Sequence, residues 1–180
     1  MPLRLNVLIS NRGFINNQSN CFWFQSDNGA KFNLDAVFLR KQKIMTVQQN
    51  AENILQEDFF SQWMGVRLIE IREHYCKIEM PIRKEMSNGI GTVHGGVTFS
   101  FAESALAYSC LPLGETCVAL NCSINFTKAV KLGDTLTAES ELIANMKKTA
   151  VYDIKVTNQE SKLVASFRGT VYKLDKKLNG

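Results

Sequence analysis

Apolar residues recur at helical spacing in two separate stretches of the chain. The first stretch begins near position 47 and is expected to end at Gly65, and the second covers residues 96–111. The second is apolar on nearly every side, which predicts a helix in the centre of the fold, ending at Pro112 and Gly114. The apolar stripe of the first helix consists of Val47, Ile54, Leu55, Phe59 and Trp63.

Alternating apolar and polar residues predict β-strands around these helices. Two short strands are expected at about 66–73 and 75–82. A central helix flanked by strands that are joined by short turns indicates an α+β fold, in which an antiparallel sheet wraps around the helix. One apolar face of a later strand comprises Val118, Leu120, Cys122, Ile124 and Phe126. The four longer strands are predicted at 117–126, 134–146, 149–158 and 162–173.

Residues 1–44 show no sustained period and are interpreted as an extension outside the core. They hold six basic and two acidic side chains, which accounts for the whole formal net charge of +4. The extension is interpreted either as a poorly ordered tail or an over-long translation start with Met45 as initiator, or as a targeting segment or DNA-binding arm. Residues 45–175 are expected to form one domain, and its neutral balance gives no reason to expect nucleic acid as a partner.

The cysteines and histidines argue against a disulfide framework and against a metal site. Five cysteines occur without any Cys-x-x-Cys pair, which favours a reducing, cytoplasmic location. Only His74 and His94 are present, too few for a three-histidine metal site. The longest apolar run, at about 97–113, is too short for a comfortable membrane span, so no membrane partner is expected.

Glu103 is the only formally charged residue between Glu85 and Glu115. Burying a carboxylate in an apolar segment costs free energy unless a partner or a function compensates, and such acids usually have displaced pKa values. Catalytic carboxylates are often found in surroundings of this kind. The alternative is a solvated helix face, although the neighbouring Phe99, Leu106 and Ala107 provide little polar company.

The loop before the central helix ends in His94, Gly95 and Gly96. The first N–H groups of a helix lack intrahelical partners and carry the positive end of its dipole, so the two glycine amides can polarise a carbonyl oxygen. The steric alternative is that two glycines simply let the loop enter a packed helix. His94 is either a structural residue or part of a substrate pocket, and Asn88 either forms a turn or hydrogen-bonds a water or substrate oxygen.

These residues resemble the hotdog-fold acyl-CoA thioesterases of the PaaI (phenylacetic acid degradation) type. The resemblance covers about residues 46–173, and it implies a hotdog fold and thioester hydrolysis without any cofactor or metal. It rests on Asn88-Gly89, His94-Gly95-Gly96, a carboxylate nine residues after the histidine in Ala102-Glu103-Ser104, Ile124-Asn125-Phe126 and Gly133-Asp134-Thr135-Leu136.

The resemblance also implies roles for individual residues. Glu103 matches the nucleophile or general base, the amide of Gly95 polarises the thioester carbonyl, and Asn88 matches the upstream asparagine. Ala119 occupies a position where some relatives have Ser or Thr. The role of orienting the water therefore either passes to Asn121 or Ser123 or has no residue to perform it. His94 matches the histidine of the family's His-Gly pair and joins the catalytic candidates, and Gly96 is a further substrate-binding candidate. For the CoA phosphates, surface cations near the sheet edge are candidates, each with a solvated charge as the alternative: Lys128, Lys147, Lys148 and Arg168.

Family members form homodimers or homotetramers with the active site across the dimer interface, so Glu103 is expected to face the His94–Gly96 loop of a second copy. The substrate is expected to be an acyl-CoA or aryl-CoA. The alternative is a non-catalytic acyl-CoA-binding regulatory module, and a dehydratase fits the motif spacing less well. The sequence leaves the acyl preference open, because the candidate pocket residues are equally suited to the core: Trp63, Phe99, Phe101, Tyr108 and Leu111.

Overall fold

The computed structural model describes residues 14–15, 22–25 and 31–177, and the chain divides into two compact units, 1–43 and 44–180. In the first unit, β1 (Phe14–Ile15), β2 (Phe22–Gln25) and β3 (Lys31–Asn33) form a small antiparallel sheet. Neither this sheet nor the early start of α1 (Leu34–Glu57) was expected from the sequence pattern. That residues 1–44 are an extension outside the core stays a prediction.

The helical stripe predicted from Val47 to Trp63 is interrupted at Asp58. The Asp58 carboxylate accepts a hydrogen bond from the Ser61 N–H at 3.0 Å and so starts a separate helix, α2 (Phe59–Met64). Gly65 ends α2 with a φ of 79°, as the sequence predicted. Because the chain changes direction at Asp58, Ser61 faces the core, whereas Phe59 and Trp63 are 74% and 50% exposed. The single helix predicted from Val47 to Gly65 is therefore wrong, because two helices cover this stretch.

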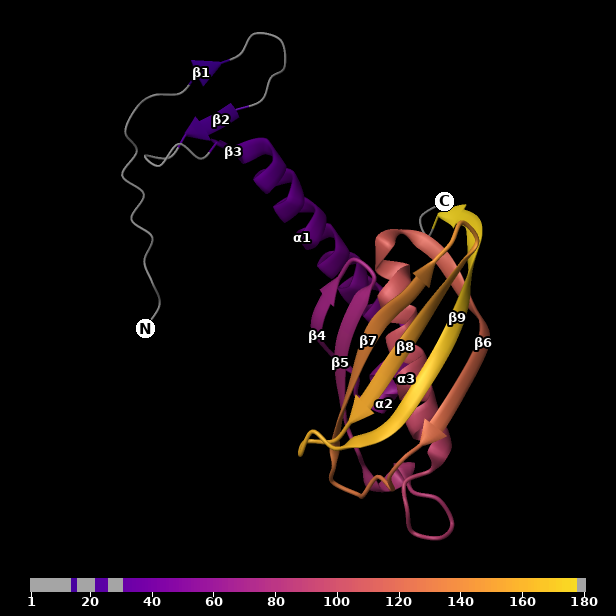
Figure 1. Cartoon of the computed structure of the whole chain (residues 1–180). Coiled ribbons are helices and arrows are strands. Elements are labelled where there is room, and N and C mark those ends of the chain that lie inside the picture. Colours follow the sequence, from indigo (N-terminus) through magenta and orange to yellow (C-terminus); the bar gives the residue numbers. More distant parts are fainter. Residues whose placement is uncertain (1–13, 16–21, 26–30, 178–180) are drawn as a thin grey trace, which may run out of the picture. The chain divides into compact units, whose positions relative to one another are not determined.

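Six antiparallel strands form one sheet in the order β4-β5-β7-β8-β9-β6 (Figure 1). Their positions confirm the predicted strands and the α+β class. The central helix, predicted at 96–111, is α3 (Gly95–Cys110). The strands are β4 (Arg67–Arg72), β5 (Tyr75–Pro81), β6 (Glu115–Phe126), β7 (Thr135–Asn145), β8 (Thr149–Thr157) and β9 (Leu163–Lys177), and two short 3-10 helices are η1 (Lys84–Met86) and η2 (Leu111–Leu113).

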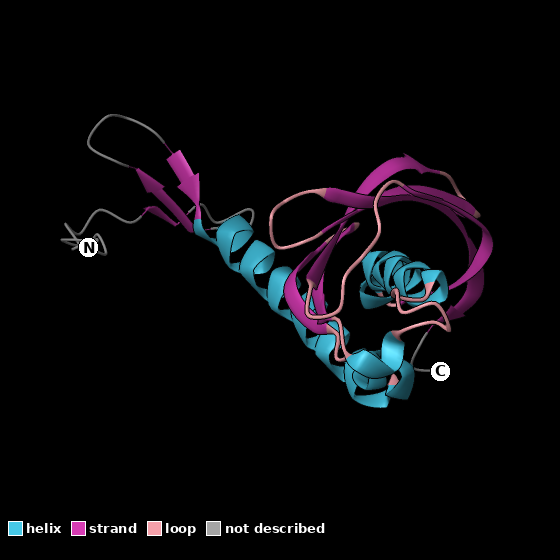
Figure 2. Ribbon diagram, turned by 90° about the horizontal axis from the view of Figure 1, so that it is seen from below, coloured by secondary structure: helices cyan, strands magenta, loops and turns pink. Residues whose placement is uncertain are grey.

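The sheet curls around α3, which lies in the centre of the domain (Figure 2). Phe101 and Leu106 of α3 are fully buried against side chains from the inner face of the sheet. Gly169 of β9 allows the closest approach, because a Cβ atom there would lie 2.4 Å from Leu106 Cδ2. The helix can therefore sit against β9 only where that strand carries no side chain.

A register shift in β6 breaks the single alternation that the sequence suggested. Ala119 pairs with Val171 and Asn121 pairs with Thr170, so Leu120 is an extra residue on the β6 side of the ladder. Beyond the shift, Cys122 and Ile124 pack on the core, as expected. Before it, the alternation reverses, and Val118 and Leu120 are 47% and 62% exposed. The prediction that all five apolar residues share one buried face is therefore wrong.

Candidate active site

The loop before α3 is folded around Asn88. Its Oδ1 accepts hydrogen bonds from the N–H groups of Ile90 at 3.0 Å and Thr92 at 3.1 Å, and its Nδ2 donates to Thr92 Oγ1 at 2.7 Å. The Asn88 backbone N–H also donates to the Thr92 carbonyl at 2.7 Å. The side chain thus performs the turn chemistry that was one of its two interpretations, and its polar atoms are engaged within the loop.

His94 caps the N-terminus of α3. Its Nδ1 accepts a hydrogen bond from the Gly96 N–H at 2.9 Å, so Nδ1 carries no proton in this arrangement. A Cβ atom at Gly96 would lie 2.9 Å from Nδ1, which explains why this position is glycine. The structural interpretation of His94 therefore explains its hydrogen bond with Gly96. The Gly96 N–H is already used in this bond.

Gly95 is the first residue of α3, and its N–H has no hydrogen-bond partner among the described residues. It lies beside Phe126, whose Cζ would be 3.3 Å from a Cβ at this position. Gly95, Phe126 and Lys128 line a pocket of about 320 Å³ at the N-terminus of α3. The positive end of the helix dipole and one free donor therefore face an open pocket, an arrangement that suits a carbonyl oxygen or an anion.

Glu103 is half-buried in the middle of α3. It forms no hydrogen bond and no ion pair with any residue in the described part of the chain. Burial raises the pKa of its carboxyl group, and the negative charge of Asp58 raises this pKa further. A carboxylate of this kind accepts a proton more readily than one in water, so Glu103 can serve as a base.

Glu103 and Gly95 cannot act on the same carbonyl within one chain. They are eight residues apart on a continuous helix, which separates their backbones by about 12 Å along the helix axis. A base and an oxyanion donor both have to lie about 3 Å from the atoms they serve. The two groups of one subunit's α3, one at its N-terminus and one in its middle, therefore cannot serve the same substrate carbonyl.

The charge of Asp58 acts on Glu103, and Asp58 is bonded to Tyr108. Tyr108 was expected to line the pocket or the core, whereas Asp58 was not assigned to the site. The Tyr108 hydroxyl donates to Asp58 Oδ2 at 3.2 Å, and Ser61 Oγ lies 3.3 Å from Ser104 Oγ. The available signal was Asp58 itself, because aspartate is among the residues that favour the N-cap of a helix. It was hidden because the apolar stripe suggested one continuous helix.

The other predicted substrate-binding residues are spread over the sheet. Asn121 and Ser123 are exposed on β6, where Ser123 pairs with Arg168 of β9. Arg168 is not a free cation, since its Nε and Nη2 both donate to the Asp153 carboxylate at 2.6 Å. Lys147 lies in the turn after β7, at the opposite end of the sheet from Lys128. Of the predicted phosphate-binding residues, only Lys128 lines the Gly95 pocket.

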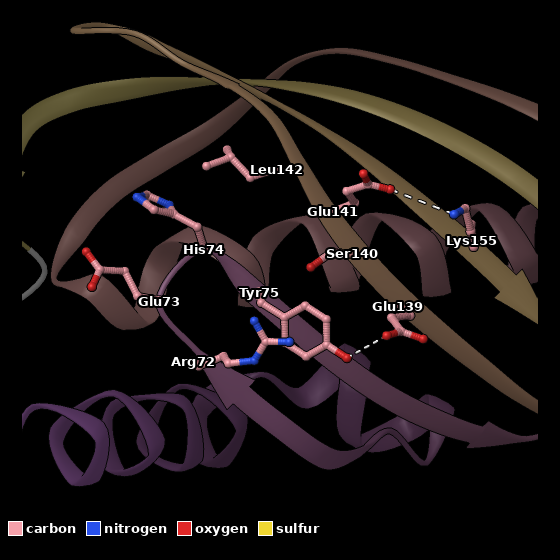
Figure 3. Close-up of a pocket in the computed structure, with 9 residues that line it drawn as sticks. All are labelled: Arg72, Glu73, His74, Tyr75, Glu139, Ser140, Glu141, Leu142 and Lys155. Carbon is pink, nitrogen blue, oxygen red and sulfur yellow. Dashed lines mark hydrogen bonds and ion pairs between the residues drawn. The ribbon is translucent and has the colours of Figure 1, made fainter. Parts of the chain in front are cut away.

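A second pocket, of about 560 Å³, lies between the β4–β5 hairpin and strands β7 and β8 (Figure 3). None of the predicted site residues lines it. The Tyr75 hydroxyl donates to Glu139 at 2.7 Å, and Lys155 forms an ion pair with Glu141 at 3.7 Å. The carboxylates of Glu139 and Glu141 therefore each have a partner. Burial raises the pKa of Tyr75 to about 12. Glu139, Glu141 and His74 thus differ from Glu103, because each of them has a hydrogen-bond or ion-pair partner.

Two further properties concern metals and membranes. Within the described ranges, no group of three or more His, Cys, Asp or Glu side chains is placed to hold a metal ion. Among the helices that the structure describes, none combines the length and apolarity needed to cross a membrane.

Comparison with known proteins places this geometry in a family. Residues 90–165 match the Thioesterase superfamily. The acyl-coenzyme A thioesterase PaaI of Escherichia coli is 36% identical over 132 residues, which cover 73% of this chain and 94% of the relative. The solved structure of the E. coli PaaI protein, from the phenylacetic acid degradation operon, aligns with a TM-score of 0.72 at 35% identity, over 75% of this chain and 98% of that one.

A hypothetical thioesterase protein from Streptococcus pneumoniae, solved with coenzyme A, aligns with a TM-score of 0.60 at 28% identity. That alignment covers 62% of this chain and 88% of the other. The shared fold, the identity over most of the domain and the isolated carboxylate on the central helix agree with one another. The chain therefore belongs to the thioesterase superfamily and is an acyl-CoA thioesterase of the PaaI type with a hotdog fold.

Proposed function

We propose that this chain hydrolyses aryl-CoA and acyl-CoA thioesters, with phenylacetyl-CoA as the representative substrate, to the free acid and CoA. The observation that carries the proposal is a pair of reactive groups without partners. The Glu103 carboxylate is half-buried with a raised pKa, and the Gly95 N–H is a free donor at the start of α3. An acid that accepts protons and an amide that polarises a carbonyl are the two groups that thioester hydrolysis needs.

Glu103 acts as a general base on water in this proposal. It takes one proton while the water oxygen forms a bond to the thioester carbon, and the Gly95 N–H binds the resulting oxyanion. When the intermediate collapses, the carbon–sulfur bond breaks and the proton passes to the CoA sulfur. The products are the free acid and the CoA thiol, and Glu103 is ionised again. Asn88 and His94 hold the loop and the helix start that present Gly95.

The complete site requires two copies of the chain. About 12 Å of helix separates Glu103 from Gly95 within one subunit. Glu103 of one subunit therefore has to act together with the Gly95 amide of a second subunit. The edge strand β6 supports this arrangement, because it has β9 on one side only and exposes Val118 and Leu120. Edge strands with exposed apolar side chains favour pairing with a second copy. A homodimer is therefore the smallest active form in this proposal.

An apolar acyl group fits the surroundings of Glu103. Phe99 lies one turn before Glu103 on α3 and packs its ring edge against Phe167 at a centroid distance of 5.5 Å. The relative encoded in a phenylacetic acid degradation operon supports an aryl substituent. At the other end of the substrate, Lys128 beside the Gly95 pocket is the candidate contact for the CoA phosphates.

The test measures release of free CoA thiol from a panel of phenylacetyl-, benzoyl-, short-chain and long-chain acyl-CoAs. We expect the highest turnover with phenylacetyl-CoA. Glu103→Gln should lower kcat by about 100-fold or more, because it removes a general base. The matched control is Glu141→Gln, which removes an exposed carboxylate from an ion pair on β7 and should leave kcat unchanged.

Two results would contradict the proposal. Wild-type turnover by Glu103→Gln would show that the base lies elsewhere. Negligible thiol release across the panel, together with tight binding of the intact CoA esters, would instead favour a binding module without hydrolysis.

A further inference from the structure

Thr98 of α3 is a buried residue that lines the same pocket as Gly95. Its side chain is 2% exposed, and its hydroxyl has no hydrogen-bond partner among the described residues. In the described part of the chain, every fully buried side-chain nitrogen or oxygen has a partner. The Thr98 hydroxyl is therefore not sealed in the core, and the space that it reaches is this pocket of about 320 Å³.

A free hydroxyl is not the ordinary state of a buried Ser or Thr in a helix, where the side chain usually donates to a carbonyl three or four residues earlier. Ser109 of α3 follows this rule, since its hydroxyl donates to the Ala105 carbonyl at 2.7 Å. Ser104 has a partner as well, because its Oγ lies 3.3 Å from Ser61 Oγ. Of the buried Ser and Thr residues that the structure describes in α3, Thr98 is the one whose hydroxyl is left for a ligand.

The other threonines that line the pocket have partners within the chain. Thr92 Oγ1 accepts a hydrogen bond from Asn88 Nδ2 at 2.7 Å, and the Thr127 hydroxyl donates to the Leu163 carbonyl at 2.8 Å. A pocket with apolar walls and a few polar groups is typical of ligand sites, in which the polar groups fix the orientation of the ligand. The apolar part of the wall consists of Val93, Phe126, Ala129 and Val130.

Thr98 lies on the same face of α3 as Gly95. Residues three apart are neighbours on a helix, and side chains tilt toward its N-terminus, so the Thr98 side chain extends toward Gly95. The rise between the two residues is about 4.5 Å along the helix axis. An oxygen bonded to the Gly95 N–H lies outside the first turn, beyond the start of the helix. Thr98 is therefore placed for a second polar group of the same ligand.

We propose that Thr98 is a specificity-determining residue whose hydroxyl hydrogen-bonds an amide of the pantetheine arm of CoA. This inference rests on the proposed function, in which the Gly95 N–H binds the thioester carbonyl. The pantetheine arm starts at the thioester sulfur, and its first amide lies close to that sulfur. The phosphates are at the far end of the arm, and Lys128, their candidate contact, lines the same pocket. The arm therefore runs through the pocket past Thr98.

The Thr98 hydroxyl suits an amide better than it suits the other polar groups of CoA. Sulfur is a weak acceptor, and a phosphate bonds more strongly to a cation such as Lys128. An amide has a donor and an acceptor, and a hydroxyl can pair with either. An amide that enters an apolar pocket without a partner costs free energy, and Thr98 supplies the partner. A site built in this way should discriminate against a thioester that lacks the amide.

The first test uses Thr98→Val, which removes the hydroxyl and keeps the shape of the side chain, and Thr98→Ser, which keeps the hydroxyl. Two phenylacetyl thioesters are compared in full-length protein. The N-acetylcysteamine ester carries the amide, and the pentyl ester has a chain of the same length without it. We expect wild type and Thr98→Ser to prefer the amide-bearing ester in kcat/KM by about tenfold, and Thr98→Val to lose this preference.

Ser109→Ala is the matched control. It also removes a buried hydroxyl from α3, but one that already donates to the Ala105 carbonyl. Ser109→Ala should therefore keep the preference for the amide-bearing ester. If Thr98→Val does not fold, Thr98→Ala takes its place, because it removes the same hydroxyl without adding a methyl group.

The second test measures the binding of CoA itself by calorimetry, which needs no turnover. The Kd for CoA should be about tenfold higher in Thr98→Val than in wild type, and Thr98→Ser should restore it. With phenylacetyl-CoA, KM should rise in Thr98→Val while kcat changes little. The reason is that the amide takes no part in breaking the carbon–sulfur bond, so the lost hydrogen bond weakens ground-state and transition-state binding equally.

The outcomes separate this inference from the proposed function. An equal preference for the amide-bearing ester in wild type and Thr98→Val would overturn the role of Thr98, even if Glu103→Gln abolishes turnover. If neither ester nor any acyl-CoA is hydrolysed, the proposed function fails and calorimetry alone decides. Weaker CoA binding by Thr98→Val would then support the contact, and an unchanged Kd would overturn it.

Discussion

Gly169→Ala should destabilise the domain, because it overfills the contact between α3 and β9. The added Cβ would lie 2.4 Å from Leu106 Cδ2 and 3.0 Å from both Leu106 Cδ1 and Phe167 Cε1. Leu106 and Phe167 are each 1% exposed, so both side chains are held within the packed core. Overpacking of this kind costs about 1–3 kcal/mol, whereas the lower unfolded-state entropy of Ala offsets about 0.4–1 kcal/mol. The expected net loss is about 1–2 kcal/mol.

The assay is thermal unfolding followed by circular dichroism. A net loss of this size corresponds to a fall in Tm of about 2–8 °C for a chain of this length. Gly89→Ala is the control, because no atom lies within 4 Å of a Cβ at that position. It should leave Tm nearly unchanged.

A double-mutant cycle tests the cause of the destabilisation. Leu106→Ala removes two of the three atoms that crowd the new Cβ, including the nearest, and it costs about 2–5 kcal/mol alone because it leaves a cavity. In that background Gly169→Ala should be neutral or stabilising, with an interaction energy of at least about 1 kcal/mol. An equal cost of Gly169→Ala in both backgrounds would refute the steric reasoning.

Two further predictions concern Glu103 and its partner groups. The pKa of Glu103 is higher in the folded state than in the unfolded state, so the domain loses stability as the pH rises above the unfolded-state pKa and Glu103 ionises. Glu103→Gln removes this ionisation and should therefore raise Tm at pH 7. At acidic pH, where Glu103 is protonated in both states, the gain in Tm should disappear. An equal gain at all pH values would contradict this reasoning. Mixing Gly95→Pro chains with Glu103→Gln chains should restore activity. In random dimers about half are mixed, and one of the two sites in each mixed dimer has both an intact Glu103 and an intact Gly95. The restored activity should therefore reach about a quarter of the wild-type activity. Proline is tolerated at the first position of a helix, so Gly95→Pro should fold, and a lack of restoration would place both groups in one subunit.

The sequence by itself determined the elements of the domain and the residues of the reactive motif. Periods of 3.6 and 2 residues predicted α3 and the six strands of the main sheet, because each element buries one side and repeats locally. The isolation of Glu103 and its spacing from His94 are also properties of the chain as written, and they pointed to acyl-CoA thioesterases. The predicted class of fold and enzyme followed from these local features together with the family resemblance.

Only the tertiary structure decided how these elements meet. Asp58 and Tyr108 are 50 residues apart in the chain, so no local pattern indicates that they bond to each other. The extra residue at Leu120 changes which side chains of β6 face the core, because the register depends on the pairing with β9. Likewise, the hydrogen bond from Gly96 to His94 left Gly95 as the free amide. Packing and hydrogen bonding between distant segments determine these details, whereas periodicity records only the burial of each segment.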